Sequence, residues 1–417
     1  MVRSMRHVAL VAPLFLENTN RYVAAFSALD GVKLSVISQD PARVIPPSLR
    51  GRIAGHYQVR DVADGQELAR AVRGLQRGIG PVDRLTGVLE QLQLPLAEAR
   101  ELTNVPGMRP KIARRFRDKD VMKEVLRAHG VSVAASQLVG SMAELVRFTD
   151  SVGFPIIVKP QAGLGARGTH RLESKEDLDA LVRLGMGPTE AYPLQAEQFI
   201  RAREFTCETV TIHGRPVWRS GTRYFPTPLE VLETPWMQYC VLLPREIEAP
   251  WTDFAAVNSS ALDALFGQDR EVTGTALTHM EWFLADGGKM YVNEVGARPP
   301  GVHIMPLMGL AYGVDMIKAW AELISFDRFT PPERGAAAGA ACFRGQGAGT
   351  RVAEVVGLQA AVEKVGSALV ELRAPKVGQA RAQSYEGEGY AIVKAATTEQ
   401  VKQALLALVE TVKVRYA

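Results

Sequence analysis

Two glutamates on neighbouring strands of a predicted hairpin have the clearest potential for chemistry. Glu281 and Glu294 lie in two apolar runs on either side of Gly287-Gly288. A two-residue turn at these glycines would set the two glutamates directly opposite each other. Like charges in that position destabilise a hairpin, whereas a Mg²⁺ ion bound together with substrate phosphates is held by such carboxylates. A three-residue turn would place them on opposite faces, and two solvent-facing glutamates are the alternative.

An arginine follows the second glutamate closely. In Arg298-Pro299-Pro300-Gly301 the two prolines stiffen the backbone and fix the direction of Arg298. A guanidinium beside a metal–carboxylate cluster suits a phosphoryl group or a developing oxyanion. A plain salt bridge between Arg298 and one of the glutamates is the alternative.

A glycine-rich loop precedes these residues along the chain. Gly163, Gly165 and Gly168 form a GxGxxG pattern after the short β run at 154–160. Because the following residues look extended, we expect a hairpin tip rather than the dinucleotide-binding turn, which needs a helix start. Glycines let backbone N–H groups approach phosphate oxygens closely, and Lys159 could reach the same oxygens. A flexible hairpin with an ordinary lysine is the alternative.

Two further segments hold weaker candidates. Carboxylates and backbone groups around 195–204 could bind adenine and ribose, although solvated charge is the stronger interpretation from these residues alone. Residues 223–245 are rich in prolines and aromatics, which is typical of a long functional loop. Trp236 and Tyr239 in that loop could line a substrate pocket. His279 and His303 could also contact substrate, or be packed structural histidines.

The elements that must position these residues begin with an α/β pattern. Over residues 1–115, short apolar runs alternate with helical patterns, which predicts a doubly wound parallel sheet. Strands are expected at 8–14 and 33–38, and helices at 21–29, 66–75 and 83–102. Further along, Ser141 with Glu144 and Ser174 with Asp177 form the capping-box pattern of helix starts. A small C-terminal unit is expected from about residue 335, after a Pro-Pro break.

Composition and charge exclude several classes of function. The net charge is only +4, and the basic cluster at 109–119 is better explained as a solvated helix face than as a nucleic-acid patch. The three cysteines are far apart, which argues against a zinc site or disulfide framework and favours a cytoplasmic protein. The apolar run at 8–16 lacks a signal-peptide cleavage site, so we expect a buried strand. No apolar run is long enough to span a membrane.

Taken in order, these residues resemble the ATP-grasp superfamily, over roughly residues 115–330. The flanking regions look similar to those of its L-amino-acid ligase and biotin-carboxylase-like branches. The resemblance implies an ATP-grasp fold with a doubly wound N-terminal domain over 1–115, an α+β lid over 116–202, a core over 203–334 and a small C-terminal α+β subdomain over 335–417. It also implies an ATP site made of Lys119, Lys159, Gly163, Gly165, Gly168, Glu197, Gln198, Phe199, Ile200 and Glu204.

The activity that the resemblance implies is that of an ATP-dependent carboxylate–amine ligase. Glu281 and Glu294 would hold Mg²⁺, or Mn²⁺, and would act in catalysis with Lys159 and Arg298. A carboxylate, expected to be that of an amino acid, would become an acyl phosphate before an amine attacks it. Arg298, Gly301, His279, His303, Trp236 and Tyr239 are the candidate substrate contacts. Small-molecule acids and amines are the expected partners, and a homodimer is usual among relatives.

Two departures from the family pattern stand out. Gly296 replaces an asparagine that often follows the second glutamate as a metal ligand, which leaves the number of metal ions open. Gly301 is followed by Val302 rather than by a second glycine, so the substrate loop could be shaped differently. A biotin-carboxylase-like carboxylase and a nucleotide-binding protein without catalysis are the alternative functions.

Overall fold

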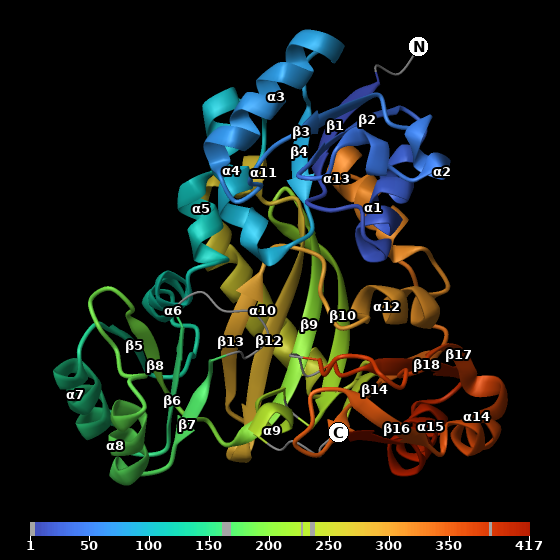
Figure 1. Cartoon of the computed structure of the whole chain (residues 1–417). Coiled ribbons are helices and arrows are strands. Elements are labelled where there is room, and N and C mark those ends of the chain that lie inside the picture. Colours follow the sequence, from blue (N-terminus) through green and yellow to red (C-terminus); the bar gives the residue numbers. More distant parts are fainter. Residues whose placement is uncertain (1–4, 161–167, 227, 234–237, 383–385) are drawn as a thin grey trace.

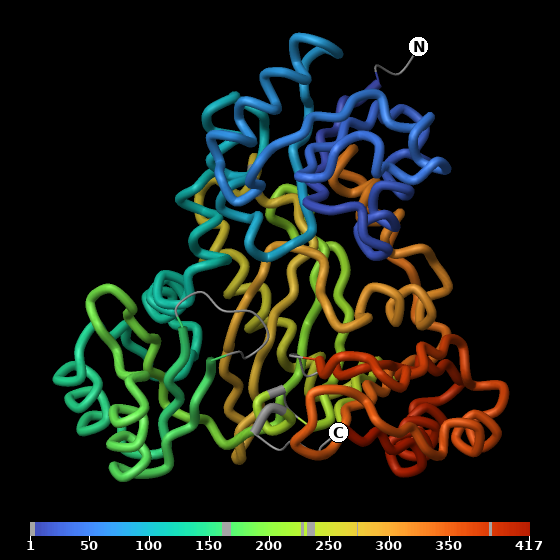
Figure 2. Tube along the Cα trace, viewed as in Figure 1, coloured from blue at the N-terminus to red at the C-terminus, as the bar shows by residue number. Residues whose placement is uncertain are grey.

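The fold of the chain is a set of four β-sheets with helices on their faces. A computed structural model describes residues 5–160, 168–226, 228–233, 238–382 and 386–417. Figure 1 shows the N-terminal sheet at one end, a lid to one side below it, and a large central sheet that continues into the C-terminal region. The Cα trace in Figure 2 follows the same arrangement. The mixed α/β class expected from the sequence is confirmed.

The N-terminal sheet is parallel and doubly wound. Its strand order is β3-β2-β1-β4, with bounds β1 Arg6–Val11, β2 Val32–Ser38, β3 Gly55–Gln58 and β4 Arg84–Gly87. The apolar run near the N-terminus is therefore a strand, whose residues from His7 to Val11 are buried. Helices α1 (Glu17–Ser27), α3 (Gly65–Ile79) and α4 (Gln93–Thr103) pack around this sheet.

The helix expected over 83–102 was wrong in its first part. Residues 84–87 form the edge strand β4, and the helix α4 begins only at Gln93. Leu85, Leu89, Leu92 and Leu96 recur at helical spacing, which disguised the strand. All but the half-buried Leu89 are buried, but Leu85 lies on the strand and the others lie on the turn and helix after it.

A helix from the later part of the chain also packs against the N-terminal region. The helix α13 (Met316–Phe326) places Trp320 edge-on to Tyr22 and Phe26, with ring centroids 5.5 Å apart in both pairs. Figure 1 shows α13 beside α1 (Glu17–Ser27), although the two helices are far apart in the sequence. The N-terminal sheet is thereby tied to the central sheet through a shared apolar core.

The lid is a small antiparallel sheet with two helices. Its strand order is β5-β8-β6-β7, with bounds β5 Ser136–Val139, β6 Ile156–Pro160, β7 His170–Leu172 and β8 Leu194–Gln198. Helices α7 (Met142–Val152) and α8 (Lys175–Arg183) begin at Ser141 and Ser174, whose hydroxyls accept from the N–H groups three residues on. Strands β6 and β7 pair antiparallel, so the glycine loop joins a hairpin, as expected.

The central sheet is antiparallel and crosses the expected boundary at residue 335. Its order is β13-β12-β9-β10-β11-β14-β18-β17. The bounds are β9 Ala202–Ile212, β10 Arg215–Phe225, β11 Tyr239–Leu243, β12 Ala276–Ala285, β13 Met290–Gly296, β14 Ala337–Phe343, β17 Leu369–Arg373 and β18 Gly389–Ala395. Because β14 pairs with β11, the C-terminal region extends this sheet. It adds α15 (Thr398–Thr411) and a small sheet of β15 Gly345–Gln346, β16 Val352–Val356 and β19 Lys413–Tyr416.

The expectation of an irregular functional loop over 223–245 was wrong. The described part of that stretch contains the end of β10, the short helix α9 (Pro228–Glu233) and the strand β11. The many prolines and aromatics hid the regular elements in the sequence pattern. Tyr224 and Tyr239 are in fact buried strand residues that pack against each other.

Helices cover one face of β9, β12 and β13 and leave the other face to the site. Helices α6 (Lys119–Ala128) and α10 (Trp251–Phe266) pack on the covered face, where Phe254 stacks on Trp282 with ring centroids 3.9 Å apart. Because side chains alternate along a strand, the polar residues between these apolar ones point to the opposite face. Among the described residues, no helix is long and apolar enough to cross a membrane.

Candidate active site

The hairpin of β12 and β13 sets Glu281 opposite Glu294, although its turn differs from the expected one. The loop Asp286–Gly288 has three residues, and its two glycines adopt positive φ angles. From this loop the ladder pairs Trp282 with Val292, a register that by itself would carry Glu294 to the opposite face. The two-residue turn was therefore wrong, and the pairing of the glutamates needs a second feature.

That feature is a β-bulge at Asn293. The register shifts between Trp282 and Glu281, so that one extra residue of β13 lies between the two pairs. Val292 and Val295 both belong to the buried core, and Asn293 and Glu294 between them both line the cavity. The Asn293 amide donates to Glu281 Oε2 at 3.4 Å. The bulge thus brings two carboxylates and an amide to one side of the sheet.

Polar side chains continue across the sheet in register with this pair. Glu281 pairs with Thr206 on β9, and Thr206 pairs with Thr222 on β10. The next row on the same face contains Ser220, Glu208, His279 and Gly296. The sheet therefore presents a polar floor to the cavity instead of an apolar face.

Glu208 anchors this floor from below. It is fully buried and accepts from Thr206 Oγ1 at 2.7 Å, Thr222 Oγ1 at 3.0 Å and His279 Nδ1 at 2.8 Å. Nε2 of His279 lies 3.7 Å from Glu281 Oε1. Although burial alone would lower it, the hydrogen bonds of Glu208 and Glu281 raise the pKa of His279 to about 9. His279 is therefore a cation held between two carboxylates, with one ring nitrogen already taken by Glu208.

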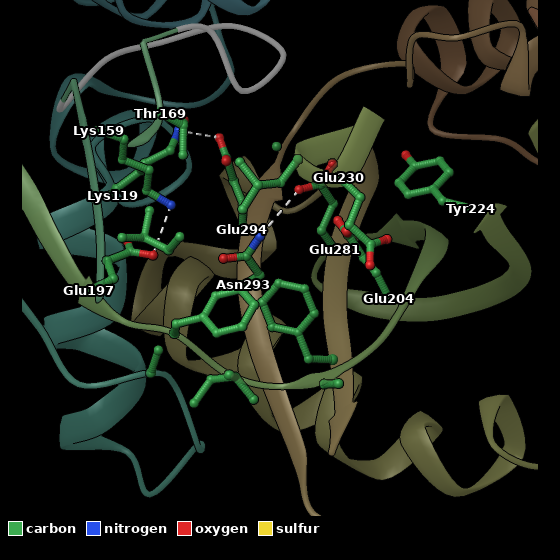
Figure 3. A pocket seen from close by; sticks show the side chains of 18 of the residues that line it. Lys119, Lys159, Thr169, Glu197, Glu204, Tyr224, Glu230, Glu281, Asn293 and Glu294 are labelled. Atoms are coloured by element: carbon green, nitrogen blue, oxygen red, sulfur yellow. Dashed lines mark hydrogen bonds and ion pairs between the residues drawn. The ribbon is translucent and has the colours of Figure 1, made fainter. Parts of the chain in front are cut away.

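Two lysines form the opposite, cationic side of the cavity. Lys119 on α6 lies 2.7 Å from Glu294 Oε1, and Lys159 on β6 lies 2.8 Å from Glu197 Oε2. Figure 3 shows these lysines and Glu197 on one side, with Glu294 between them and the carboxylates of Glu204, Glu230 and Glu281. Burial alone would raise the pKa of Glu294, but Lys119 and Lys159 lower it to about 2. The glutamate is thus ionised at neutral pH and available to a cation.

The far side of the cavity is acidic. Glu204 and Glu281 come from neighbouring strands, and Glu230 from α9 lies beside them in Figure 3. Burial, and then the charge of Glu281, raise the pKa of Glu204 well above its usual range. A hydroxyl-bearing or cationic group would relieve this repulsion better than an anion would.

The end of β8 and the segment after it also line the cavity. Gln198, Phe199 and Ile200 are lining residues, as is Glu204 farther on. Glu197 is a lining residue too, but its carboxylate is buried and directed at the lysines. If this segment binds a base, the contact from Glu197 is therefore made by its backbone and not by its carboxylate.

Arg298 is held by a glutamate that sequence reasoning missed. Its Nε lies 2.5 Å from Oε2 of Glu90, a buried residue just after β4, and its Nη1 donates to Pro299 O. A Cβ at Gly296 would lie 3.4 Å from Glu90 Oε2 and 3.6 Å from Arg298 Cγ. A Cβ at this position would make ordinary van der Waals contact with the ion pair. Glu90 and Arg298 therefore border the position at which the family pattern has an asparagine.

The remaining candidates are divided between the cavity and the core. Gly301 lines the cavity, whereas Gly168, with a φ of 69°, lies at the end of the glycine loop. Tyr239 is fully buried in the core, and His303 packs on Tyr390 with ring centroids 3.9 Å apart. The structure brings neither of these two to the cavity wall. Gly163, Gly165 and Trp236 lie outside the described residues.

Sequence reasoning missed several other residues that shape the site. Glu208 could have been found, because it continues the alternation of Glu204 and Thr206 along one strand. Lys123 could also have been found, one helical turn after Lys119. No sequence signal pointed to Glu90, because it lies in the N-terminal region and contacts Arg298 only in the folded chain. The cavity has a volume of about 250 Å³.

These side chains fit a magnesium ion that is coordinated partly by the protein and partly by substrate phosphates. Within the described ranges, no group of three acidic, histidine or cysteine side chains is arranged so that it could hold a metal ion by itself. Glu281 and Glu294 supply two carboxylates and Asn293 an amide oxygen. Mg²⁺ commonly takes one or two carboxylates and completes its shell with water and substrate phosphates.

Comparisons with known proteins agree with this geometry. Residues 118–202 match the family model described as the carbamoyl-phosphate synthase L chain, ATP binding domain. An L-arginine-specific L-amino acid ligase from Bacillus subtilis is 24% identical over 73% of this chain and 70% of its own length. The chain spans only 11–22% of the carbamoyl phosphate synthase large chains that it also matches.

Solved structures of ligases and synthetases have the same fold as this chain. An L-amino acid ligase from Bacillus licheniformis aligns over 100% of both chains with a TM-score of 0.74 and 19% identity. An N5-carboxyaminoimidazole synthetase from Staphylococcus aureus, complexed with ADP, aligns over 98% of both chains with a TM-score of 0.70 and 14% identity. The chain therefore shares the fold of these ligases, and it is similar in sequence to an ATP binding domain over residues 118–202 and to an L-amino acid ligase over most of its length.

Proposed function

We propose that this protein is an ATP-dependent ligase that joins a carboxylate, most simply that of an amino acid, to an amine and releases ADP and phosphate. The observation that carries the proposal is the cavity in which Glu281 and Glu294 face Lys119 and Lys159. Similarity to L-amino acid ligases and to an ADP-complexed synthetase supports it.

The charges of the cavity suggest how the nucleotide lies. Lys119 and Lys159 would hold the phosphates, and the segment 198–200 would contact the adenine. Glu204, whose raised pKa favours a hydroxyl partner, would bind the ribose. Glu281, Glu294 and Asn293 would hold magnesium, which supplies charge neutralisation at the phosphates.

The reaction would run in two displacements. A carboxylate oxygen attacks the γ-phosphorus and the bond to ADP breaks, which gives an acyl phosphate. The amine nitrogen then attacks the acyl carbon, loses a proton and expels phosphate. Arg298, held by Glu90 at the edge of the cavity, would stabilise the oxyanion between these events. No enzyme nucleophile is required.

Gly301 and Val302 would border the acyl substrate. Val302 has a φ of 50°, an uncommon conformation for a β-branched residue, and it lines the cavity beside Gly301. Strained backbone of this kind concentrates at functional sites. His279, whose Nδ1 is bonded to Glu208, would act on the substrate only through its other ring nitrogen.

Some expectations from the sequence stay predictions. These are the domain boundaries at 115, 202 and 334, the cytoplasmic location and the homodimer. Light scattering after size-exclusion chromatography would test the homodimer directly.

The first experiment is ADP release from ATP and Mg²⁺ across a panel of amino and organic acids, with and without hydroxylamine. ADP together with an acyl hydroxamate is expected for one class of acid. AMP with pyrophosphate would mean adenylation and would reject the mechanism. Replacing the hydroxylamine with candidate amines, followed by mass spectrometry, would then identify the product.

A further inference from the structure

A completely buried lysine lies next to the cationic side of the cavity. Lys123 follows Lys119 by one turn on α6, so both side chains lie on the same helix face. Its relative exposure is 0%, whereas Lys119 and Lys159 both line the cavity. Lysine is rarely buried to this degree unless it is paired.

The partner of Lys123 is the carboxylate that also holds Lys159. Lys123 Nζ lies 2.6 Å from Glu197 Oε1, and Lys159 Nζ lies 2.8 Å from Glu197 Oε2. The side chains of Lys123 and Glu197 are 0% and 5% exposed, and that of Lys159 is 14% exposed. Glu197 therefore bridges a lysine without access to the cavity and a lysine with access to it.

The charge balance of this triad explains why the inner lysine is needed. With Lys123 present, two ammonium groups and one carboxylate leave one net positive charge. Without Lys123, Glu197 and Lys159 would cancel each other. Burying an ammonium group is costly, and the neighbouring residues Met122 and Leu126 show that apolar side chains pack well on this helix. An apolar residue at 123 would therefore avoid the cost but neutralise Lys159.

We propose that Lys123 is a positioning residue that neutralises Glu197, so that Lys159 keeps a net positive charge for the phosphates of a nucleoside triphosphate. The inference rests on the proposed function only for the identity of that ligand. Glu197 thereby acts as a rigid support for Lys159 and not as its neutralising partner.

The ionisation of both groups is compatible with this role. Burial alone would raise the pKa of Glu197, but Lys123 and Lys159 lower it to about 2. Burial lowers the pKa of Lys123 to about 8, against the opposing charge of Glu197. At pH 7 the carboxylate is ionised and the inner lysine is predominantly protonated.

The test changes the charge of the triad and measures nucleotide binding, so it does not need turnover. Calorimetry at pH 7 would measure the Kd of the magnesium complex of an ATP analogue with a non-hydrolysable β,γ-imido bridge. The variants are Lys123→Met, Glu197→Gln, the double variant of these two, and Lys123→Arg. Lys402→Met, on α15, where the lysine side chain is 44% exposed, is the matched control for loss of one lysine charge.

The expected pattern separates charge from packing. Lys123→Met should weaken binding on the order of tenfold, as for loss of one partly screened charge. The double variant restores the net charge and should recover most of that loss, and Lys123→Arg should bind nearly as the wild type does. Glu197→Gln alone should bind at least as tightly as the wild type. This variant also tests the charge balance if Lys123→Met does not fold.

Three results would overturn the proposal. They are unchanged binding by Lys123→Met, a double variant as weak as Lys123→Met, or a Glu197→Gln variant that binds about tenfold more weakly. Binding by the wild type with any of these results would reject only the role of Lys123. A wild-type protein that does not bind the analogue would instead reject the proposed function.

Discussion

At the scale of single residues, the cavity separates its charges. Lys119 comes from the helix α6 and Lys159 from the lid strand β6, whereas Glu204 and Glu281 come from the central sheet. Glu294 lies between the two groups, paired with Lys119. Such a separation suits a ligand with an anionic end and a hydroxyl-bearing part, and it orients that ligand before any chemistry occurs.

The carboxylate of Glu294 and the amide of Asn293 should differ in their effects when they are replaced. Glu294→Gln should lower turnover by at least about 100-fold, because several kcal/mol of charge stabilisation at the phosphates are lost. Asn293→Ala removes an amide that orients Glu281, and should raise the Mg²⁺ concentration for half-maximal turnover by roughly 10-fold or more. Magnesium titrations of ADP release would measure both.

A matched control comes from the same strand. Tyr291→Phe on β13 retains the strand and the aromatic ring, and should leave the magnesium titration unchanged. Equal magnesium requirements for Asn293→Ala and the wild type would contradict the role of the amide.

At the scale of elements, the loop into α3 depends on one buried carboxylate. Glu67 accepts from the backbone N–H groups of Asp61 and Arg60 and from the Arg60 side chain. These hydrogen bonds lower the pKa of Glu67 to about 2. The resulting stability is fully present above the pKa of about 4.5 expected in the unfolded chain, and is lost as the pH falls towards 2.

Thermal unfolding as a function of pH would measure this effect. The Tm of Glu67→Gln should lie below that of the wild type at pH 6, and the difference should shrink between pH 4.5 and pH 2. A difference that stays constant over this range would show that the carboxylate charge contributes nothing.

The strand β13 shows where sequence reasoning reaches its limit at this scale. The opposition of Glu281 and Glu294 could be predicted, but the predicted turn was one residue too short. The turn length was wrong and the bulge was not foreseen, and the two errors cancelled each other. The three-residue loop shifts the register by one residue, and the bulge at Asn293 shifts it back before Glu294. A bulge depends on how the strand packs against its neighbours, and periodicity alone does not reveal it.

At the scale of the whole molecule, two ion pairs between residues far apart in sequence join the N-terminal region to the rest of the chain. Glu90, just after β4, holds Arg298, and Arg84 on β4 pairs with Asp327 at 2.5 Å. Both contacts join residues more than 200 positions apart in the sequence. The mixed α/β class and the ATP-grasp likeness could be predicted, because local patterns and motif order carry them. Glu90 could not, because only the assembled fold brings it to Arg298.

The helix α13 should therefore be a stability element of both regions. Trp320→Ala removes a buried indole from between Tyr22 and Phe26, and should lower the free energy of unfolding by about 3–5 kcal/mol. Urea denaturation followed by circular dichroism would measure the loss. A change below about 1 kcal/mol would mean that the N-terminal sheet does not depend on this contact.

The most direct test of the central claim follows the oxygen atoms of the acid. A substrate acid labelled with ¹⁸O in its carboxylate would be turned over with ATP, Mg²⁺ and an amine, and the phosphate products analysed by mass spectrometry. Activation as an acyl phosphate predicts one ¹⁸O atom in the released inorganic phosphate, together with unlabelled ADP. Label in AMP would contradict the account, because it would show that the carboxylate attacks the α-phosphorus.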